Sequence, residues 1–385
     1  MGKLKNIKWS RYVNYYVIGA LTVVFAILSL TGGVPASNAI LLETIGINII
    51  LAVSLSLVVG FLGELSLGHA AFMCVGAYLG GKVSAVLAES PLGDGILTLI
   101  VSLIVGGICA GICGFIIGLP ALRLKGDYLA IVTLAFGEIV RVLFLNSSDE
   151  SFGGALGLRT PRYDKQYLFT IIFVVVLITL AVLQNMIKSK HGRAITAIRD
   201  NEIAAKATGI NVTKYKLIGF IVASVFAGFA GVLFSYTQSN VSSATFDYNY
   251  SIEILVMVVL GGMGSINGAI ISATLITYIN NFLSTLDIPF LAERGIEVAV
   301  IKDMLYALIL IVIVIYNNAP ALRGVREKYN LRALINKLRK HDPSKEASDQ
   351  GRWDRVPTKI SMNEVLSTDL VVKESRSDKG DKEVK

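Results

Sequence analysis

Long runs of apolar residues recur along this sequence and limit the folds that it can adopt. Many of them reach about 20 residues, the length at which a helix crosses roughly 30 Å of hydrocarbon. Of the 385 residues, 54% are hydrophobic and 17% are charged, whereas soluble domains carry about a quarter charged residues. The sequence therefore predicts an all-α fold, a polytopic bundle of transmembrane helices.

About ten apolar segments follow one another along the chain, and basic residues indicate their orientation. Lysines and arginines concentrate in cytoplasmic loops, and four of them precede the first segment. With a cytoplasmic N-terminus, the basic loops after the fourth, sixth and tenth segments all fall on that side, as ten crossings require. The segments are 14–33, 38–60, 66–88, 96–119, 127–146, 167–187, 215–236, 251–262, 266–285 and 300–316.

Three parts follow from this pattern. Residues 1–37 form an N-terminal cytoplasmic segment and a first membrane helix, which we expect to be retained because no A-x-A cleavage site follows it. Residues 38–320 form the membrane domain, with a cytoplasmic loop at 188–214. Residues 321–385 are charged and poor in aromatic residues, so we expect a basic, disordered cytoplasmic tail. The net charge of +8 gathers at the two ends, which indicates anionic lipid and not nucleic acid as the partner.

Two glycine-rich stretches interrupt the apolar pattern, GFLGELSLGHAAF (60–72) and LGGMGSINGA (260–269). Non-helical backbone at membrane depth is tolerated where it is buried in protein or lines an aqueous cavity. Glycine-interrupted segments in the two halves of a transporter indicate the substrate path. We therefore predict broken helices, with 38–146 and 215–316 as inverted repeats. The candidate residues of the translocation path are Gly63, Glu64, Ser66, Gly68, His69, Gly262, Gly264 and Ser265.

Ionisable residues inside apolar segments are costly and are therefore candidates for function. Glu138 and Arg141 are three residues apart and can pair on one helical face. The pair would be either a structural ion pair between helices or part of a gate or a substrate contact. Four other ionisable residues lie nearer the ends of segments, where long side chains reach the interface. They are Glu43, Lys82, Glu253 and Asp303.

The sequence predicts no catalytic site and no metal site. The stretch GAYLGGKVS (76–84) nearly matches a P-loop, but Val83 stands where Mg²⁺ binding needs a hydroxyl, and the stretch lies in an apolar helix. The three histidines and three cysteines do not combine into a set of metal ligands. We expect a chain that is not an enzyme and that carries no cofactor of its own.

The stretch GRAITAIRDNEIAAKATGINVTKYK (192–216) is charged although it lies between two apolar segments. Asp200 or Asn201 is a suitable N-cap, and Gly209 suits the left-handed turn that ends a helix. This pattern predicts a short helix of about eight residues in the cytoplasmic loop. Small residues on it would allow a cytoplasmic protein to approach closely. The residues expected to contact that partner are Arg199, Asp200, Glu202, Ala204, Ala205 and Gly209.

The spacing Glu-x-Ala-Ala-x-x-x-Gly from Glu202 to Gly209 resembles the coupling loop of ABC importer permeases. Ile203 departs from the usual pattern, in which a Glu stands at that position. Over roughly residues 38–320 the chain resembles the M-type permease subunit of the leucine/isoleucine/valine transport system. Besides the loop, the stretches that carry this resemblance are GELSLGHAAFMCVGAY (63–78), LPALRLKGDYLAIVTLAFGEIVR (119–141) and VMVVLGGMGSINGA (256–269).

The resemblance implies the permease subunit of an ATP-driven importer for branched-chain amino acids, in the bacterial cytoplasmic membrane with both termini inside. A second homologous permease would complete the pore, and two ABC ATPase subunits would bind ATP and Mg²⁺. An extracytoplasmic binding protein would deliver the amino acid, near Phe152 and 240–251, where the chain departs from the family pattern. The alternatives are an importer for urea, short amides or another small polar solute, and an ion-coupled secondary transporter that needs no ATPase.

Overall fold

The computed structural model describes most of the chain between residues 36 and 285. The described residues are 36–89, 93, 95–124, 126–160 and 165–285, with isolated positions at 18–20, 22–23, 304, 308 and 311. The chain divides into two units, Met1–Ile315 and Tyr316–Lys385, and every described residue belongs to the first. The predicted segments 14–33 and 300–316 lie outside the described residues except for those isolated positions, and the tail 321–385 lies wholly outside them.

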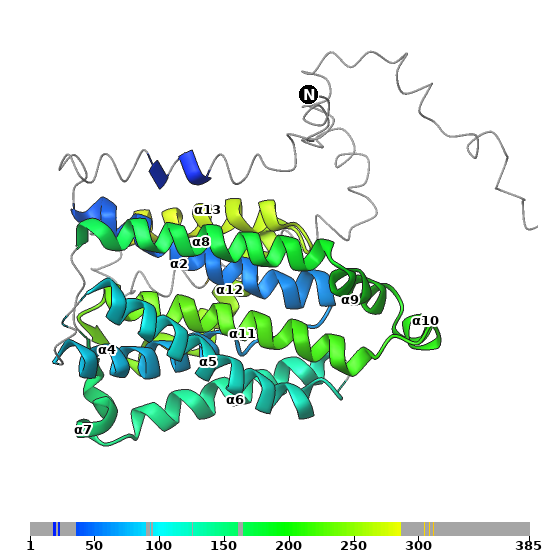
Figure 1. Ribbon diagram of the computed structural model, residues 1–385, viewed down its shortest axis with the longest axis horizontal. Helices are drawn as coiled ribbons and strands as arrows, with labels where there is room; N and C mark the ends of the chain where they lie inside the picture. The colour runs from blue at the N-terminus through cyan, green and yellow to red at the C-terminus, as the bar shows by residue number, and fades with distance from the viewer. Residues whose placement is uncertain are drawn as a thin grey trace, which may run out of the picture. The chain divides into compact units, whose positions relative to one another are not determined.

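Long apolar helices make up the described part of the chain and run back and forth in a bundle (Figure 1). Six of the helices that the structure describes are long and apolar enough to cross a membrane, which confirms the prediction of a polytopic helical membrane protein. Two further predicted segments correspond to α12 (Tyr248–Gly261), which is a shorter apolar helix, and α13 (Ile266–Thr285). The six spans are Ser37–Leu62, His69–Ala88, Ile96–Ala121, Tyr128–Leu145, Leu168–Lys188 and Val212–Thr237.

The helices and strands follow one another along the chain in this order. Before the first long loop come α2 (Ala36–Ser56), the π-helix η2 (Leu57–Leu62), α3 (His69–Val75), the π-helix η3 (Gly76–Gly80), α4 (Gly81–Ala88), α5 (Ile96–Ala121) and α6 (Asp127–Leu145). The loop contains α7 (Asp149–Phe152), the 3₁₀-helix η4 (Gly154–Leu156) and β1 (Leu158–Arg159). Next come α8 (Lys165–Lys188), α9 (Lys190–Asp200), α10 (Glu202–Ala207), α11 (Val212–Thr237), β2 (Asn240–Val241) and the 3₁₀-helix η5 (Ser243–Phe246), ahead of α12 and α13.

Loops from distant parts of the sequence meet at each end of the bundle. α9 and α10 lie at one end, which we call the α10 end, together with the loop after α5, because Arg123 and Lys206 line the same cleft. At the opposite end, the β end, β1 pairs antiparallel with β2. Figure 1 shows α9 and α10 on the right and α7 on the left. The two basic loops that lie among the described residues, after the fourth and sixth predicted segments, therefore share one end of the bundle, whereas the basic loop after the tenth segment lies outside the described residues.

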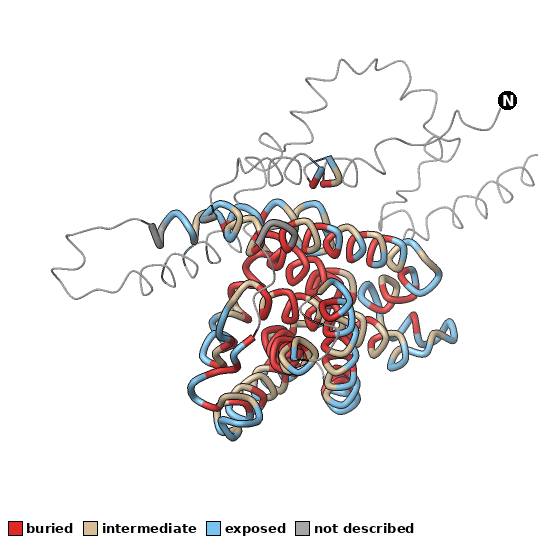
Figure 2. The backbone as a smooth tube through the Cα atoms, turned by 60° about the vertical axis from the view of Figure 1, so that its left-hand side comes forward, coloured by how far each residue is buried: buried red, intermediate tan, exposed pale blue. Residues whose placement is uncertain are grey.

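α11 is packed tightly against α5 and η3 because glycines remove the side chains between them. A Cβ added at Gly76 would overlap the carbonyl of Gly228, and one added at Gly107 would overlap the ring of Phe229. Small residues allow this close packing, which holds membrane helices together where lipid provides no hydrophobic driving force. Buried residues accordingly concentrate in the middle of the bundle (Figure 2).

Candidate functional site

The first glycine-rich stretch forms the connection between α2–η2 and α3. The π-helix η2 ends at Gly63, whose φ of 78° lies in the left-handed region. The backbone N–H of Leu67 then donates to Thr133 Oγ1 of α6 at 3.0 Å, and the N–H of Ala70 donates to Ser251 Oγ of α12 at 3.2 Å. Neighbouring helices thus satisfy backbone groups that this break frees from helical bonding, as the location in an apolar bundle requires.

The second stretch forms the turn 262–265 between α12 and α13. Gly262 and Gly264 both have positive φ, 88° and 82°. Ser265 Oγ accepts a hydrogen bond from the N–H of Gly268 at 3.1 Å, which caps α13. With 14 residues, α12 is about 21 Å long, so it is shorter than the roughly 30 Å of hydrocarbon in a bilayer.

The first glycine-rich stretch (60–72) and the turn 262–265, called the first and second breaks, contact each other. A Cβ added at Gly60 would overlap the backbone nitrogen of Gly264, so the first break approaches the second as closely as two backbones can. We predicted both stretches as parts of one path, and the structure brings Gly60, Gly63 and Gly264 to one place at the α10 end.

Other candidate path residues lie away from this contact. The ring Nε2 of His69 is 2.8 Å from Ser54 Oγ of α2, and both residues are buried. A Cβ added at Gly68 would overlap the carbonyl of Thr133, so this glycine serves close packing against α6. The Ser66 hydroxyl is buried and has no hydrogen-bond partner among the residues that the structure describes. A direct role of these residues in transport stays a prediction.

The charged stretch folds as two helices, and we predicted one of them. α9 begins after Ser189, whose Oγ accepts hydrogen bonds from the N–H groups of His191 and Gly192 at 3.2 and 3.4 Å. Its buried residues include Ala194, Ile195 and Ile198. Their spacing of three and four is the helical signal that could have identified α9 from the sequence.

α10 has the predicted caps in a shorter helix. Asn201, and not Asp200, is the N-cap, because its Oδ1 accepts a hydrogen bond from the N–H of Ala204 at 2.9 Å. Gly209 ends the helix at a φ of 85°, and the N–H of Ile210 reaches back to the carbonyl of Ala205 at 3.1 Å. This is a Schellman ending. The helix has six residues, whereas about eight were expected.

Arg199, at the end of α9, contacts the first break and approaches the second. Its Nη1 donates to the carbonyl of Gly60 at 3.0 Å, while its Nε and Nη2 lie 3.1 and 2.9 Å from Asp200 Oδ1. A Cβ added at Gly63 would lie 2.7 Å from Arg199 Cγ, and one at Gly264 would lie 3.5 Å from Nη1. A cation beside the last carbonyls of a helix is electrostatically favourable.

Lys216, at the start of α11, joins the first break to α10. Its Nζ lies 2.5 Å from Glu64 Oε1 and 3.0 Å from Glu202 Oε2. The Lys216 side chain is 7% exposed and that of Glu64 is 13% exposed, whereas Glu202 is open to solvent at 43%. We did not single out Lys216 from the sequence, although it lies inside the apolar segment 215–236. The rule that a charge within such a segment needs a partner could have identified it.

Open clefts flank α10. One of about 800 Å³ is lined by Gly63, Glu64 and Lys216 together with residues of α9 and α10. A second of about 530 Å³ lies between α10 and the loop after α5. Ile203 lines the first of these clefts and is 83% exposed, so α10 presents an apolar side chain in a charged surrounding.

The other intramembrane charges divide into three cases, apart from Lys82, whose Nζ reaches the loop that contains Glu150. Arg141 Nε lies 2.8 Å from Glu138 Oε2, and both residues belong to α6, so the pair is within one helix and not between helices. Glu43 and Glu253 are 3% and 9% exposed. The expectation that they reach the interface is therefore wrong, and the amide of Asn280 donates to Glu253. Asp303 lies outside the described residues.

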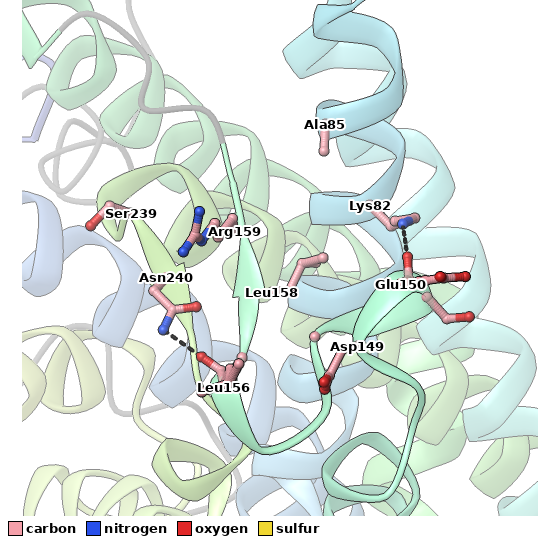
Figure 3. Close-up of a pocket in the computed structure, with 12 residues that line it drawn as sticks. Lys82, Ala85, Asp149, Glu150, Leu156, Leu158, Arg159, Ser239 and Asn240 are labelled. Carbon is pink, nitrogen blue, oxygen red and sulfur yellow. Dashed lines mark hydrogen bonds between the residues drawn. The ribbon is translucent and has the colours of Figure 1, made fainter.

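The β end carries its own pocket of about 820 Å³ (Figure 3). Lys82 Nζ donates to the carbonyl of Glu150 at 3.0 Å, and the Asn240 amide donates to the carbonyl of Leu156 at 2.7 Å. The Asn240 bond joins the two loops that were predicted to lie outside, and the Lys82 bond ties α4 to the first of them, so that both loops contribute to one mixed-charge surface. Among the described residues, no group of three His, Cys, Asp or Glu could hold a metal ion.

A bundle of six membrane-length helices, with two touching glycine breaks and a capped helical projection, defines an integral membrane protein of the polytopic helical class. Residues 37–314 match the family described as branched-chain amino acid transport system, permease component, and the chain belongs to this family of ABC permeases. This confirms the resemblance that the sequence motifs indicated.

Individual relatives agree with this assignment. The chain is 35% identical over 261 residues to the high-affinity branched-chain amino acid transport system permease protein LivM of Salmonella typhimurium, and 36% identical over 261 residues to that of Escherichia coli K12. Each match covers 60% of this chain and 60% of the relative, so the chain spans about 60% of the length of these curated relatives. It is also 25% identical over 313 residues to the ribose import permease protein RbsC of E. coli K12, covering 78% of this chain and 84% of that protein. No solved structure matches the chain significantly.

Proposed function

We propose that this chain is the membrane-spanning permease subunit of an ATP-driven importer for branched-chain amino acids. The observation that carries the proposal is the contact of both α9 and α10 with the first break: Arg199 reaches Gly60, and Lys216 binds Glu64 and Glu202 together. The projecting helix is thereby linked to the backbone that would line the path.

The α10 end would face the cytoplasm and bind the ATPase. Its basic residues, Arg123 and Lys206 among them, are on the side that the positive-inside rule assigns to the cytoplasm. α10 is held at both ends by its caps, so a partner that moves it would displace the whole helix. A partner shifts a conformational equilibrium only as far as its affinities for the two states differ. ATP-driven closure of two ATPase subunits would supply that difference, with ATP and Mg²⁺ bound on those subunits.

Two further partners complete the proposal. A second homologous permease would form the other half of the pore. An extracytoplasmic binding protein would dock at the β end, where the charged surface around Asp149, Glu150 and Arg159 offers both signs of charge. Complementary charges guide such encounters and set their specificity.

The substrate assignment rests on the relatives named LivM. The similarity to a ribose permease makes a sugar the useful contrast, beside the alternatives urea and short amides. Branched aliphatic side chains suit a path between apolar helices, while backbone groups at the breaks would meet the charged ends of the amino acid.

Uptake of labelled leucine tests the assignment. Cells that lack this chain should lose high-affinity leucine uptake and regain it with the wild-type chain. Excess unlabelled isoleucine and valine should compete for that uptake, whereas ribose and urea should not. Uptake that does not depend on the chain would overturn the substrate assignment, and competition by ribose alone would replace it with a sugar.

A further inference from the structure

Lys216 and Arg199 form two separate bridges that connect α9 and α10 to the first break. Lys216 is the fifth residue of α11 and reaches Glu64, in the first break, and Glu202, on α10. Arg199 comes from α9 and reaches the Gly60 carbonyl. The bridged residues are 152 and 139 positions apart in the sequence, so only the fold brings them together.

The Lys216 bridge is largely buried on the side of Glu64 and open to solvent on the side of Glu202. One ammonium group with three donors is shared by two carboxylates, and the lysine side chain is 7% exposed. Removing one partner of such a buried pair leaves an uncompensated charge. A displacement of Glu202 with α10 must therefore either take Lys216 and Glu64 with it or break the bridge.

The second bridge runs from Arg199 to the carbonyl of Gly60, which lies in the π-helix η2. The N–H of Glu64 bonds to the carbonyl of Val58 and not to that of Gly60, and the guanidinium occupies the Gly60 carbonyl. Because the backbone of Gly60 also touches Gly264, a movement of Arg199 acts at the point where the two breaks meet.

We propose that Lys216 and Arg199 are positioning residues that transmit the displacement of α9 and α10 directly to the two glycine breaks, instead of through the spans α8 and α11 alone. This inference rests on the proposed function, since it assigns the route by which ATP hydrolysis on the partner subunits opens the path.

The test uses the whole transporter, with this chain, its companion permease and two ATPases in liposomes, with the binding protein supplied. ATP hydrolysis and leucine uptake are measured in the same vesicles. For Lys216→Met we expect leucine uptake per ATP to fall about tenfold, within the usual range of coupling effects, while ATP hydrolysis persists. Lys216→Arg should restore much of the coupling. The matched control is Lys214→Met, because Lys214 is exposed two residues earlier.

Arg199→Met is expected to behave like Lys216→Met, with Arg193→Met as its control, since Arg193 is exposed on the same helix. A proportional loss of uptake and hydrolysis in correctly assembled Lys216→Met and Arg199→Met complexes would overturn the proposal. So would an equal loss of coupling in the control variants.

A second readout does not depend on the substrate. A spin label at Met263→Cys, an exposed position in the second break, is followed in a chain whose native cysteines are replaced by alanine. We expect ATP and Mg²⁺ to change its spectrum in the wild-type background and with Lys214→Met, but not with Lys216→Met. An unaltered response with Lys216→Met would contradict the direct route. If the label responds as expected and leucine is not imported, the substrate assignment fails and the inference stands.

Discussion

Single glycines decide whether the two breaks can meet. Gly60 contacts the backbone of Gly264 where any side chain would overlap it, and backbone cannot move aside as the end of a flexible side chain can. Gly63 has the positive φ that ends η2, and Arg199 lies over its face. Because these glycines have no side chain, the two breaks can approach each other and Arg199 can lie beside them.

We predict that Gly60→Ala destabilises the folded protein. Overpacking costs about 1–3 kcal/mol, so we expect the thermal unfolding temperature of the detergent-solubilised protein to fall. The control is Gly137→Ala on α6, where the added Cβ would lie 3.9 Å from Ala71 Cβ in ordinary contact. That variant should be neutral or slightly stabilised, because alanine lowers the entropy of the unfolded chain. Equal stability of Gly60→Ala and Gly137→Ala would contradict the close approach of the breaks.

At the scale of elements, α10 is a short helix held in place by its ends. Helices of a few residues do not persist in water on propensity alone. Asn201 at its start and Gly209 at its end supply the hydrogen bonds that define it, and Ala205 is its buried contact with the rest of the protein. The element can therefore keep its shape while its exposed face binds another protein.

Changes at the caps should act on coupling and not on membrane insertion. Gly209→Pro cannot adopt a φ of 85° and removes the N–H that bonds to the carbonyl of Lys206 at 3.1 Å. We expect it to abolish leucine uptake. Asn201→Ala, which loses a cap worth about 0.5–2 kcal/mol, should reduce uptake less. Uptake and co-purification of the ATPase are measured together, with the exposed Ala207→Ser as control. Normal uptake by an abundant Gly209→Pro variant would show that α10 is not required for coupling.

At the scale of the whole molecule, the bundle has two chemically different ends. The α10 end combines basic loops with an exposed apolar Ile203, and the β end joins two loops through a two-residue strand pair. Between them, exposed apolar side chains such as Ile104, Ile108 and Ile112 follow one face of α5. In a membrane protein such a face is suited to lipid chains, so its exposure to the outside of the bundle is expected.

The orientation of these ends is testable with a thiol reagent that does not cross membranes. In a cysteine-free background, Leu156→Cys at the β end should be labelled in spheroplasts, because Leu156 is exposed. Ile203→Cys on α10 should be labelled only after the membrane is permeabilised. The reverse pattern would place α10 outside and remove the basis for an ATPase partner.

Features that depend on neighbours within a few residues could be predicted from the amino-acid sequence. Apolar length located α5, α6, α8 and α11, glycine content located both breaks, and the spacing from Asn201 to Gly209 identified α10 and its caps. α9 was missed because its apolar face is short and charged residues surround it. Segments 14–33 and 300–316 and the inverted relation of 38–146 and 215–316 stay predictions, since the described residues begin at 36 and end at 285 apart from isolated positions.

Which of these features contact one another depends on the packing of the helices. Helical and turn signals act over three or four residues, and they carry no information about a partner 152 positions away, as Lys216 is from Glu64. The sequence indicates that a charge within an apolar segment needs a partner. Which residue is that partner depends on the packing of α11 against η2 and α10. The same holds for Gly60 and Gly264, whose contact depends on how two separate turns are placed by the helices around them.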